Sequence, residues 1–197
     1  MIDIEATVDP CNARSRRLLD KLHFERADEL KEGLCYYVLK KEDVSLKPSL
    51  IVQETGLEHL EVLAGLFNEY RVFYEQESDL EGARRFLADR LSRRESVAFL
   101  ALDAASREAV GFTQLYPSFS SVSMRRIWIL NDLYVREEYR KQGAAKLLLE
   151  AAKSHARQTN AKGLELSTAV ANMTAQRLYE RHGYAKDEDF YHYYLSL

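Results

Sequence analysis

The stretch "LNDLYVREEYRKQGAAKLLLEAAKSHA" runs from Leu130 to Ala156 and combines the patterns that decide the fold. It begins as an apolar strand ending near Val135, continues as a charged turn, and enters a helix at "RKQGAAK". Gly143 lets the backbone approach a ligand closely, and the small Ala144 and Ala145 keep bulky side chains away from the helix start. Free backbone N–H groups at such a start can bind phosphate or pyrophosphate. The alternative is a solvated charged turn that caps a core helix, because neither GxxxxGK[ST] nor GxGxxG is present.

Composition describes an ordinary globular chain and argues against several function classes. The 197 residues are 46% hydrophobic and 30% charged, and the net charge of −3 disfavours a dedicated nucleic-acid binder. No apolar run approaches the roughly 20 residues that span a membrane, and the start "MIDIEATVDP" is acidic where a signal peptide is basic. Cys11 and Cys35 fit no metal or CxxC spacing. We therefore expect a cytoplasmic protein without a metal ion and without nucleic-acid or membrane partners.

Hydrophobic periodicity predicts one complete domain after the turn-like "KPS" at 47–49. The expected order is β-α-α-β-β-β-α-β-α-β, which indicates the α/β (mixed α+β) class with a central mixed β-sheet flanked by helices. The expected strands are 50–55, 96–103, 108–117, 124–136, 163–170 and a last one in 190–197, and the expected helices are 57–74, 79–94, 143–159 and 172–182.

Two motifs in this order resemble the GNAT superfamily of acyl-CoA-dependent N-acyltransferases. The first is "DLYV" at 132–135 followed by "RKQGAA" at 140–145, where Ala145 replaces the commoner glycine. The second is Asn172 at a helix start, with Tyr179 seven residues later and a Gly-aromatic turn after it. The resemblance covers 48–197 and is closest to the histone- and polyamine-type members. It implies the GNAT fold, acetyl-CoA as cosubstrate and N-acetyltransferase activity.

The resemblance also implies roles for individual residues. A backbone N–H at or near Val135 would stabilise the developing oxyanion, and Tyr179, with an ordinary pKa of about 10, would protonate the leaving thiolate. Asp132 would accept a proton from the amine directly or through water. The alternatives are core packing or a CoA contact for Tyr179 and a structural hydrogen bond for Asp132, with Asn131 expected on the opposite strand face. The implied CoA-binding residues are Leu133, Tyr134, Val135, Arg140, Lys141, Gln142, Gly143, Ala144, Ala145, Lys146, Asn172 and Tyr179.

The resemblance implies an acceptor site across the strand from CoA, bounded by the first two helices and the last hairpin. An aromatic wall with nearby carboxylates suits a cationic amine, although each tyrosine alone fits an ordinary half-buried position equally well. The candidate substrate residues are Tyr70, Tyr74, Tyr116, Asp132 and Tyr191.

The chain begins with a segment that resembles its own end. At an offset of 160, "NARSRRLLDKLHF" (12–24) aligns with "NMTAQRLYERHGY" (172–184) and shares an asparagine, an arginine and a leucine. We interpret residues 1–45 as a β-α-β-β fragment from the end of a second GNAT domain, similar to the ribosomal-protein-modifying branch. The fragment lacks the pyrophosphate loop and is too small to fold alone. It is expected to pack on the complete domain, to pair with a partner chain, or to be the remnant of a tandem protein.

Together these patterns predict an N-acetyltransferase that moves an acetyl group directly to a primary amine, with a small-molecule amine or an amino acid as acceptor. Two alternatives stay open: a protein N-acetyltransferase, and a non-catalytic acyl-CoA-binding or assembly module. A homodimer paired through its sheets is the expected oligomer.

Overall fold

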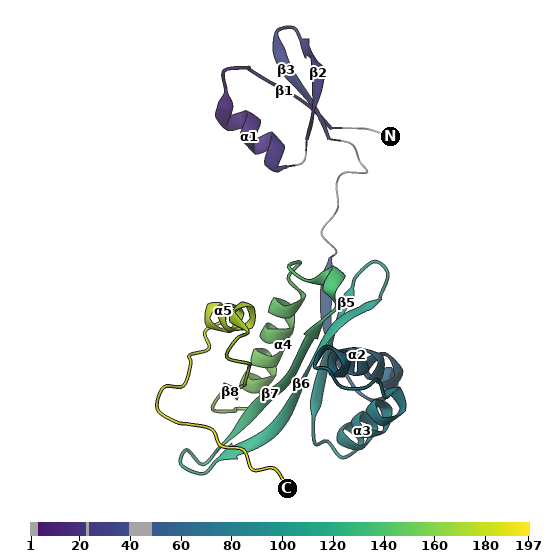
Figure 1. Ribbon diagram of the computed structural model, residues 1–197, viewed down its shortest axis with the longest axis vertical. Helices are drawn as coiled ribbons and strands as arrows, with labels where there is room; N and C mark the ends of the chain where they lie inside the picture. Colours follow the sequence, from purple (N-terminus) through teal and green to yellow (C-terminus); the bar gives the residue numbers. More distant parts are fainter. Residues whose placement is uncertain (1–3, 23, 40–48) are drawn as a thin grey trace. The chain divides into compact units, whose positions relative to one another are not determined.

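The computed structural model describes residues 4–22, 24–39 and 49–197, and the chain divides into two units, Met1–Pro48 and Ser49–Leu197 (Figure 1). In the first unit a small antiparallel sheet has the strand order β1-β3-β2. Among its described side chains only Cys35 and Tyr37 are buried, and both cysteines of the chain are free thiols. Its elements are β1 (Ile4–Val8), α1 (Ala13–Lys21), β2 (Glu25–Lys31) and β3 (Leu34–Leu39).

Helix α1 repeats the local structure of α5 (Met173–Arg181) hydrogen bond by hydrogen bond, at an offset of 160 residues. Asn12 Oδ1 accepts from the Ser15 N–H at 3.0 Å, and Asn172 Oδ1 accepts from the Ala175 N–H at 3.1 Å. After the helices, Phe24 N–H donates to the Leu19 carbonyl at 3.0 Å, and Tyr184 N–H donates to the Tyr179 carbonyl at 3.1 Å. The sequence similarity therefore corresponds to the same capped helix and the same exit turn.

The second unit is built on a five-stranded sheet in the order β4-β5-β6-β7-β8. Neighbours from β4 to β7 are antiparallel, whereas β8 is parallel to β7, so the expected mixed sheet is confirmed. The strands are β4 (Leu50–Thr55), β5 (Val97–Asp103), β6 (Ala109–Ser120), β7 (Arg125–Val135) and β8 (Leu164–Glu165).

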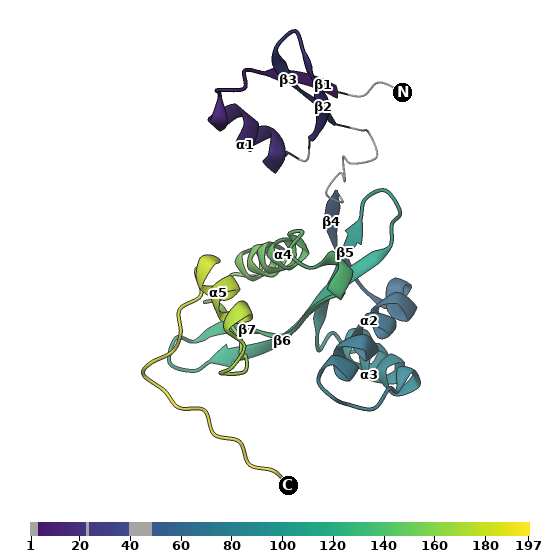
Figure 2. The ribbon, with the colours of Figure 1, turned by 45° about the horizontal axis from the view of Figure 1, so that its top comes forward.

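Helices cover both faces of this sheet (Figures 1 and 2). One core joins the sheet to α2 and α3 and includes Leu63, Leu87 and Phe112, all fully buried. The other joins it to α4, whose apolar stripe at 144, 148, 149, 152 and 156 packs against Trp128 and Leu115. The helical elements are the 3₁₀ turn η1 (Leu57–His59), α2 (Leu60–Phe73), α3 (Leu80–Ser92), the 3₁₀ turn η2 (Glu137–Tyr139) and α4 (Ala144–Gln158).

Two strand predictions differ from the structure. The strand expected over 163–170 is reduced to β8, which pairs with β7 only at Trp128–Leu164 and Ile129–Glu165. The strand expected in 190–197 is wrong, since these residues form no ladder and run as an extended segment (Figure 2). Tyrosine-rich residues favour strands, but β-structure requires a hydrogen-bonded neighbour. Here Tyr191 is 89% exposed.

A β-bulge in β7 changes which side chains lie together. Gln114 pairs with Asp132 and the next residue, Leu115, pairs with Leu130, so Asn131 is an extra residue without a partner in the ladder. The expectation that Asn131 faces away from Asp132 is therefore incorrect. The bulge lets Asn131 Nδ2 donate a hydrogen bond of 3.1 Å to Asp132 Oδ1.

Gly111 should be the position of the sheet least tolerant of a side chain. A Cβ atom there would lie 2.5 Å from the Tyr134 carbonyl oxygen and 3.1 Å from the Val135 Cα, so Gly111→Ala must push β6 and β7 apart. We expect a loss of about 1–3 kcal/mol in the free energy of unfolding, as for an overpacked core. Urea unfolding followed by the fluorescence of Trp128, the one tryptophan of the chain, measures it.

The matched control is Gly65→Ala in α2, where a Cβ meets no atom within 4 Å. That variant should gain up to about 1 kcal/mol from better helix propensity. Equal stability of Gly111→Ala and the wild type would show that the strands separate without cost.

Candidate active site

The C-terminal half of β7 has a ladder on one side only. It pairs with β6 as far as Gly111–Val135, but its parallel pairing with β8 stops at Ile129. Backbone groups that point toward β8 beyond this residue have no strand partner in the described part of the chain, and the N–H groups among them are available to a ligand. Val135 itself is 8% exposed and packs toward α4, as does Leu133.

The turn from β7 into α4 has the backbone geometry of an anion site. Lys141 and Gly143 have positive φ angles of 61° and 101°, and Gly143 is the N-cap of α4 without any side-chain cap. The first helical turn carries no acidic side chain, so its free N–H groups and the helix dipole favour an anion there. Because a Cβ on Gly143 would meet no atom within 4 Å, glycine is required by its backbone angle rather than by space.

The side chains of this loop divide into two groups. Lys141 and Lys146 are exposed at the helix start. Arg140, expected to add positive charge to the loop, instead folds back: its Nε donates to the Val135 carbonyl at 3.0 Å and its guanidinium lies 5.3 Å from the centre of the Phe73 ring. Gln142 donates from Nε2 to the Glu138 carbonyl at 2.7 Å. Arg140 and Gln142 therefore stabilise the conformation of the loop through hydrogen bonds to backbone carbonyls.

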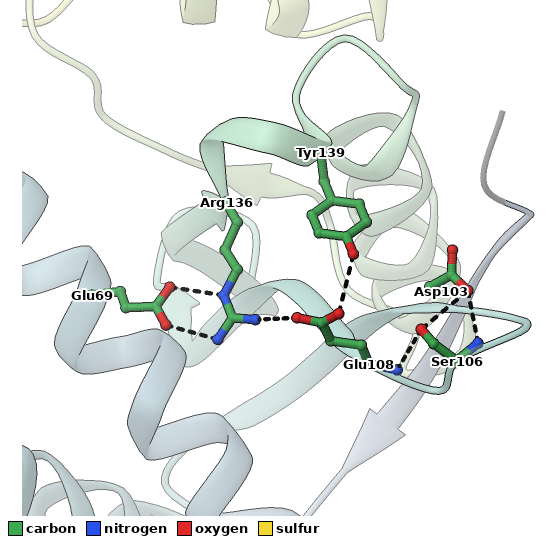
Figure 3. A network of polar contacts seen from close by, with 6 residues as sticks. All are labelled: Glu69, Asp103, Ser106, Glu108, Arg136 and Tyr139. Carbon is green, nitrogen blue, oxygen red and sulfur yellow. Dashed lines mark hydrogen bonds and ion pairs between the residues drawn. The ribbon is translucent and has the colours of Figure 1, made fainter. Parts of the chain in front are cut away.

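An ion-pair network holds the segment that precedes this loop (Figure 3). Arg136 donates to both carboxylate oxygens of Glu69 on α2, at 3.0 and 2.7 Å, and to Glu108 at 2.9 Å. The Tyr139 hydroxyl donates to the other oxygen of Glu108 at 3.1 Å. Its neighbouring carboxylates, Glu69 foremost, raise the pKa of Arg136. The network ties η2 to α2 and to the start of β6, and so fixes where the loop begins.

Asp132 is a buried carboxylate on the face of β7 that packs toward α2. It is 3% exposed, and burial raises its pKa to about 6, while the hydrogen bond from Asn131 and the proximity of the Tyr70 hydroxyl oppose that rise. No cationic side chain is among the groups that act on the Asp132 pKa. A carboxylate with this pKa is largely ionised at neutral pH and can still accept a proton.

Tyrosine side chains from three elements converge near this carboxylate. Burial and the Asp132 charge raise the pKa of Tyr70, on α2. The same two causes raise the pKa of Tyr116, on β6, to about 12. Tyr70 lies against Tyr74 with ring centres 5.0 Å apart. Burial and then Tyr74 raise the pKa of Tyr179, on α5, which keeps its proton at neutral pH. Tyr70, Tyr74 and Tyr179, expected at the site from sequence, therefore influence one another, and Tyr116 shares with Tyr70 the influence of the Asp132 charge.

Other predicted residues have different surroundings. The Asn172 side chain caps α5, and Tyr134 directs its ring toward Tyr70 and Phe73 at 6.2 and 6.3 Å, into the aromatic cluster against α2. Tyr191 lies in the exposed C-terminal segment and is not brought to the tyrosines, because that segment has no strand partner. Within 4–22, 24–39 and 49–197 there is no group of three His, Cys, Asp or Glu residues suited to a metal ion, and no helix long and apolar enough to cross a membrane.

Gln114, the cross-strand neighbour of Asp132, is a site residue that was not predicted from the sequence. It is fully buried, and its Nε2 donates to the Tyr116 hydroxyl at 2.9 Å. The available signal was one long polar side chain inside the apolar run "AVGFTQL". Its pairing with Asp132 depends on the bulge at Asn131 and is not visible in the sequence.

Comparisons with known proteins agree on one family. Residues 63–184 match the model of the acetyltransferase (GNAT) family. The uncharacterized N-acetyltransferase YhfO of Bacillus subtilis (strain 168) is 53% identical over 135 residues, which cover 68% of this chain and 89% of that protein. The D-amino-acid N-acetyltransferase HPA3 of Saccharomyces cerevisiae (strain ATCC 204508 / S288c) is 30% identical over 92 residues, 47% of this chain and 57% of that one. The crystal structure of a probable acetyltransferase shares 48% identity with a TM-score of 0.72, covering 75% of this chain and 97% of that chain.

The burial of Asp132 should make stability depend on pH in a defined direction. A folded-state pKa raised from 3.8 to about 6 means that the native state holds this proton more tightly than the unfolded state. The contribution of Asp132 is therefore most favourable below pH 3.8 and is lost as the pH rises through about 6, by on the order of 3 kcal/mol.

Asp132→Asn removes this ionisation, so the variant should gain stability relative to the wild type between pH 4 and pH 8. Urea unfolding of both proteins across this range, followed by Trp128 fluorescence, measures the difference and cancels the other titrating groups. A constant difference at every pH would contradict the raised pKa.

Proposed function

Because the chain belongs to the GNAT acetyltransferase family, we propose that it transfers the acetyl group of acetyl-CoA to a primary amine, with a small-molecule amine or an amino acid as acceptor. The observation that carries this proposal is the buried, ionisable Asp132, which has no cationic partner among the described groups. Asp132 lies near tyrosine side chains, and the next residue of β7, Leu133, faces the side of the sheet on which CoA is expected. A carboxylate in this position suits an amine that must lose a proton.

The loop from 140 to 146 fits the pyrophosphate of acetyl-CoA. Positive φ angles at Lys141 and Gly143 and the uncapped start of α4 direct backbone N–H groups outward, and Lys141 and Lys146 add positive charge. When bound, acetyl-CoA supplies an acetyl thioester. The free edge of β7 near Val135 provides backbone N–H groups to hydrogen-bond the acetyl oxygen, and it needs no side chain for this purpose.

Two side chains would manage protons during transfer. Asp132 accepts a proton from the incoming ammonium, because its pKa of about 6 leaves it ionised at neutral pH. Tyr179 remains protonated there because burial raises its pKa, and it can therefore donate a proton to a leaving thiolate. Its hydroxyl has no hydrogen-bond partner in the described residues, so it is available to a ligand.

Several observations support a small acceptor. The carboxylate lies near Tyr70, whose ring packs against Tyr74, and near Tyr116, and these aromatic surroundings favour a compact cation. HPA3 is named a D-amino-acid N-acetyltransferase, so an acceptor screen should include both L- and D-amino acids. Polyamines also present a primary ammonium group, in line with the polyamine-type resemblance, and a peptide N-terminus tests the protein N-acetyltransferase alternative.

We further propose that residues 1–45 derive from the end of a second GNAT domain. The repeated caps and exit turns of α1 and α5 support this interpretation. Leu19 stands where Tyr179 stands in the second unit, and residues 1–45 contain no counterpart of the 140–146 loop. These residues therefore supply neither the phosphate site nor the tyrosine acid, and one CoA site is expected within residues 1–197.

The deciding experiment mixes the full chain with acetyl-CoA and pools of primary amines and amino acids, and follows release of the free thiol. Amine-dependent release above hydrolysis is expected in at least one pool. Tight acetyl-CoA binding by calorimetry without release in any pool would favour the acyl-CoA-binding module instead. Sedimentation of the same sample tests the predicted homodimer.

Residues 49–197 alone should keep the activity. Both hydrophobic cores consist of residues from this unit, so removing residues 1–48 takes no core side chain away. The truncated protein should bind acetyl-CoA within about twofold of the full chain by calorimetry. Insoluble or unfolded material, judged by Trp128 fluorescence, would show that the first unit completes the second.

Tyr179→Phe should lower turnover by about a hundredfold with little change in acetyl-CoA affinity, because it removes a proton donor and keeps the ring. Tyr184→Phe is the matched control: its hydroxyl is buried and, like that of Tyr179, has no hydrogen-bond partner in the described chain. It should retain wild-type turnover. Unchanged turnover of Tyr179→Phe would remove the acid role from this residue.

A further inference from the structure

Two buried oxygen atoms at the centre of the β6–β7 ladder lack hydrogen-bond partners. Asp132 Oδ2 and Gln114 Oε1 both have no partner in the part of the chain that the structure describes, although their residues are 3% and 0% exposed. Burying such acceptors without partners costs free energy. Proteins retain this cost where a ligand supplies the missing donors.

The two oxygens belong to one site. Gln114 and Asp132 are direct cross-strand partners, so their side chains leave the sheet on the same face, a few ångströms apart. Their other polar atoms are already occupied and hold them in place: Gln114 Nε2 donates to the Tyr116 hydroxyl at 2.9 Å, and Asp132 Oδ1 accepts from Asn131 Nδ2 at 3.1 Å. Each side chain is thus anchored by one atom and presents the other.

We infer that Gln114 Oε1 and Asp132 Oδ2 together form the acceptor subsite, which binds the nitrogen of a primary amine through two N–H groups. This inference rests on the proposed function and assigns to Gln114 a direct contact with the substrate. The pair consists only of acceptors, so it matches a ligand that is rich in donors, and a primary ammonium group is such a ligand.

The geometry also explains why two oxygens suit the reaction. A primary ammonium group has three N–H bonds, of which two can donate to Gln114 Oε1 and Asp132 Oδ2. When Asp132 Oδ2 takes the proton of its own hydrogen bond, the amine keeps two N–H bonds, and the one to Gln114 Oε1 still holds the nitrogen. A quaternary ammonium group has no N–H bond and leaves both buried oxygens without a partner, which a polar site rejects strongly.

Gln114 therefore predicts a selectivity for primary ammonium groups over fully N-methylated ones. Asp132 alone would attract any cation by charge, since charge attraction needs no N–H group. The amide oxygen adds a hydrogen-bond requirement that charge does not supply. Probes of equal charge that differ in their number of N–H groups therefore separate the effect of hydrogen bonding from the effect of charge.

The test titrates the full chain, ¹⁵N-labelled and saturated with CoA, with propylammonium and with trimethylpropylammonium, and follows the binding by NMR. Both probes carry one positive charge, but only the first has N–H donors. The wild type should bind propylammonium at least about tenfold more tightly, with shifts at the Gln114 side-chain amide. Gln114→Leu should lose about tenfold for propylammonium and little for the trimethylated probe.

Two further variants serve as controls for the effect of Gln114→Leu. Gln114→Glu keeps the size and places oxygen at both terminal positions, so it should bind propylammonium at least as tightly as the wild type. Gln158→Leu changes an exposed glutamine on α4 and should alter neither affinity. The inference would be overturned if Gln114→Leu bound propylammonium as tightly as the wild type. It would also be overturned if Gln114→Glu lost as much affinity as Gln114→Leu.

Acetyl transfer separates this inference from the proposed function. With propylamine as acceptor, Gln114→Leu should raise KM by at least about tenfold, and Gln114→Glu should not. Transfer with a KM that does not depend on Gln114 would overturn the subsite and leave the function standing. Ammonium binding that depends on Gln114, without any acetyl transfer, would overturn the function and leave the subsite standing.

Discussion

Gly111 and Val135 face each other across the β6–β7 ladder at a separation that leaves no room for a Cβ atom. This close approach holds the C-terminal end of β7, which leads into the 140–146 loop, against β6 in the sheet. The same ladder contains the bulge at Asn131, which places Asp132 opposite Gln114. Because both cores of the unit pack on these strands, from α4 on one face and from α2 and α3 on the other, the ladder determines the fold and the site together.

Strand alternation within β7 separates two kinds of chemistry over a few residues. Leu133 and Val135 pack toward α4, beside the start of that helix and its free N–H groups. Asp132 and Tyr134 point to the other face, toward α2 and its aromatic side chains. One face thus carries the free N–H groups of a helix start, and the other carries buried oxygen acceptors. The free edge of β7 lies between them.

The site is maintained at the expense of local stability. A buried carboxylate without a cationic partner and an amide oxygen without a donor both disfavour folding. The surroundings limit this cost with specific contacts, namely the Asn131 amide, the Tyr116 hydroxyl and the clamp of Arg136 on Glu69 and Glu108. Rigid support from the sheet and α2 keeps the unpaired atoms in position, as preorganised polar sites require.

The sequence by itself determined the local features. The order of helices and strands through 182, the uncapped glycine start of α4 and the capped helix at Asn172 follow from periodicity and from residues within a few positions of one another. The tertiary structure decided what depends on distant partners. Gln114 meets Asp132 through a bulge, Tyr70 and Tyr179 converge from separate helices, Arg140 turns back to Val135, and residues 190–197 remain without a ladder. Such features are set by hydrogen bonds and burial between segments far apart in the chain, and no local pattern encodes them.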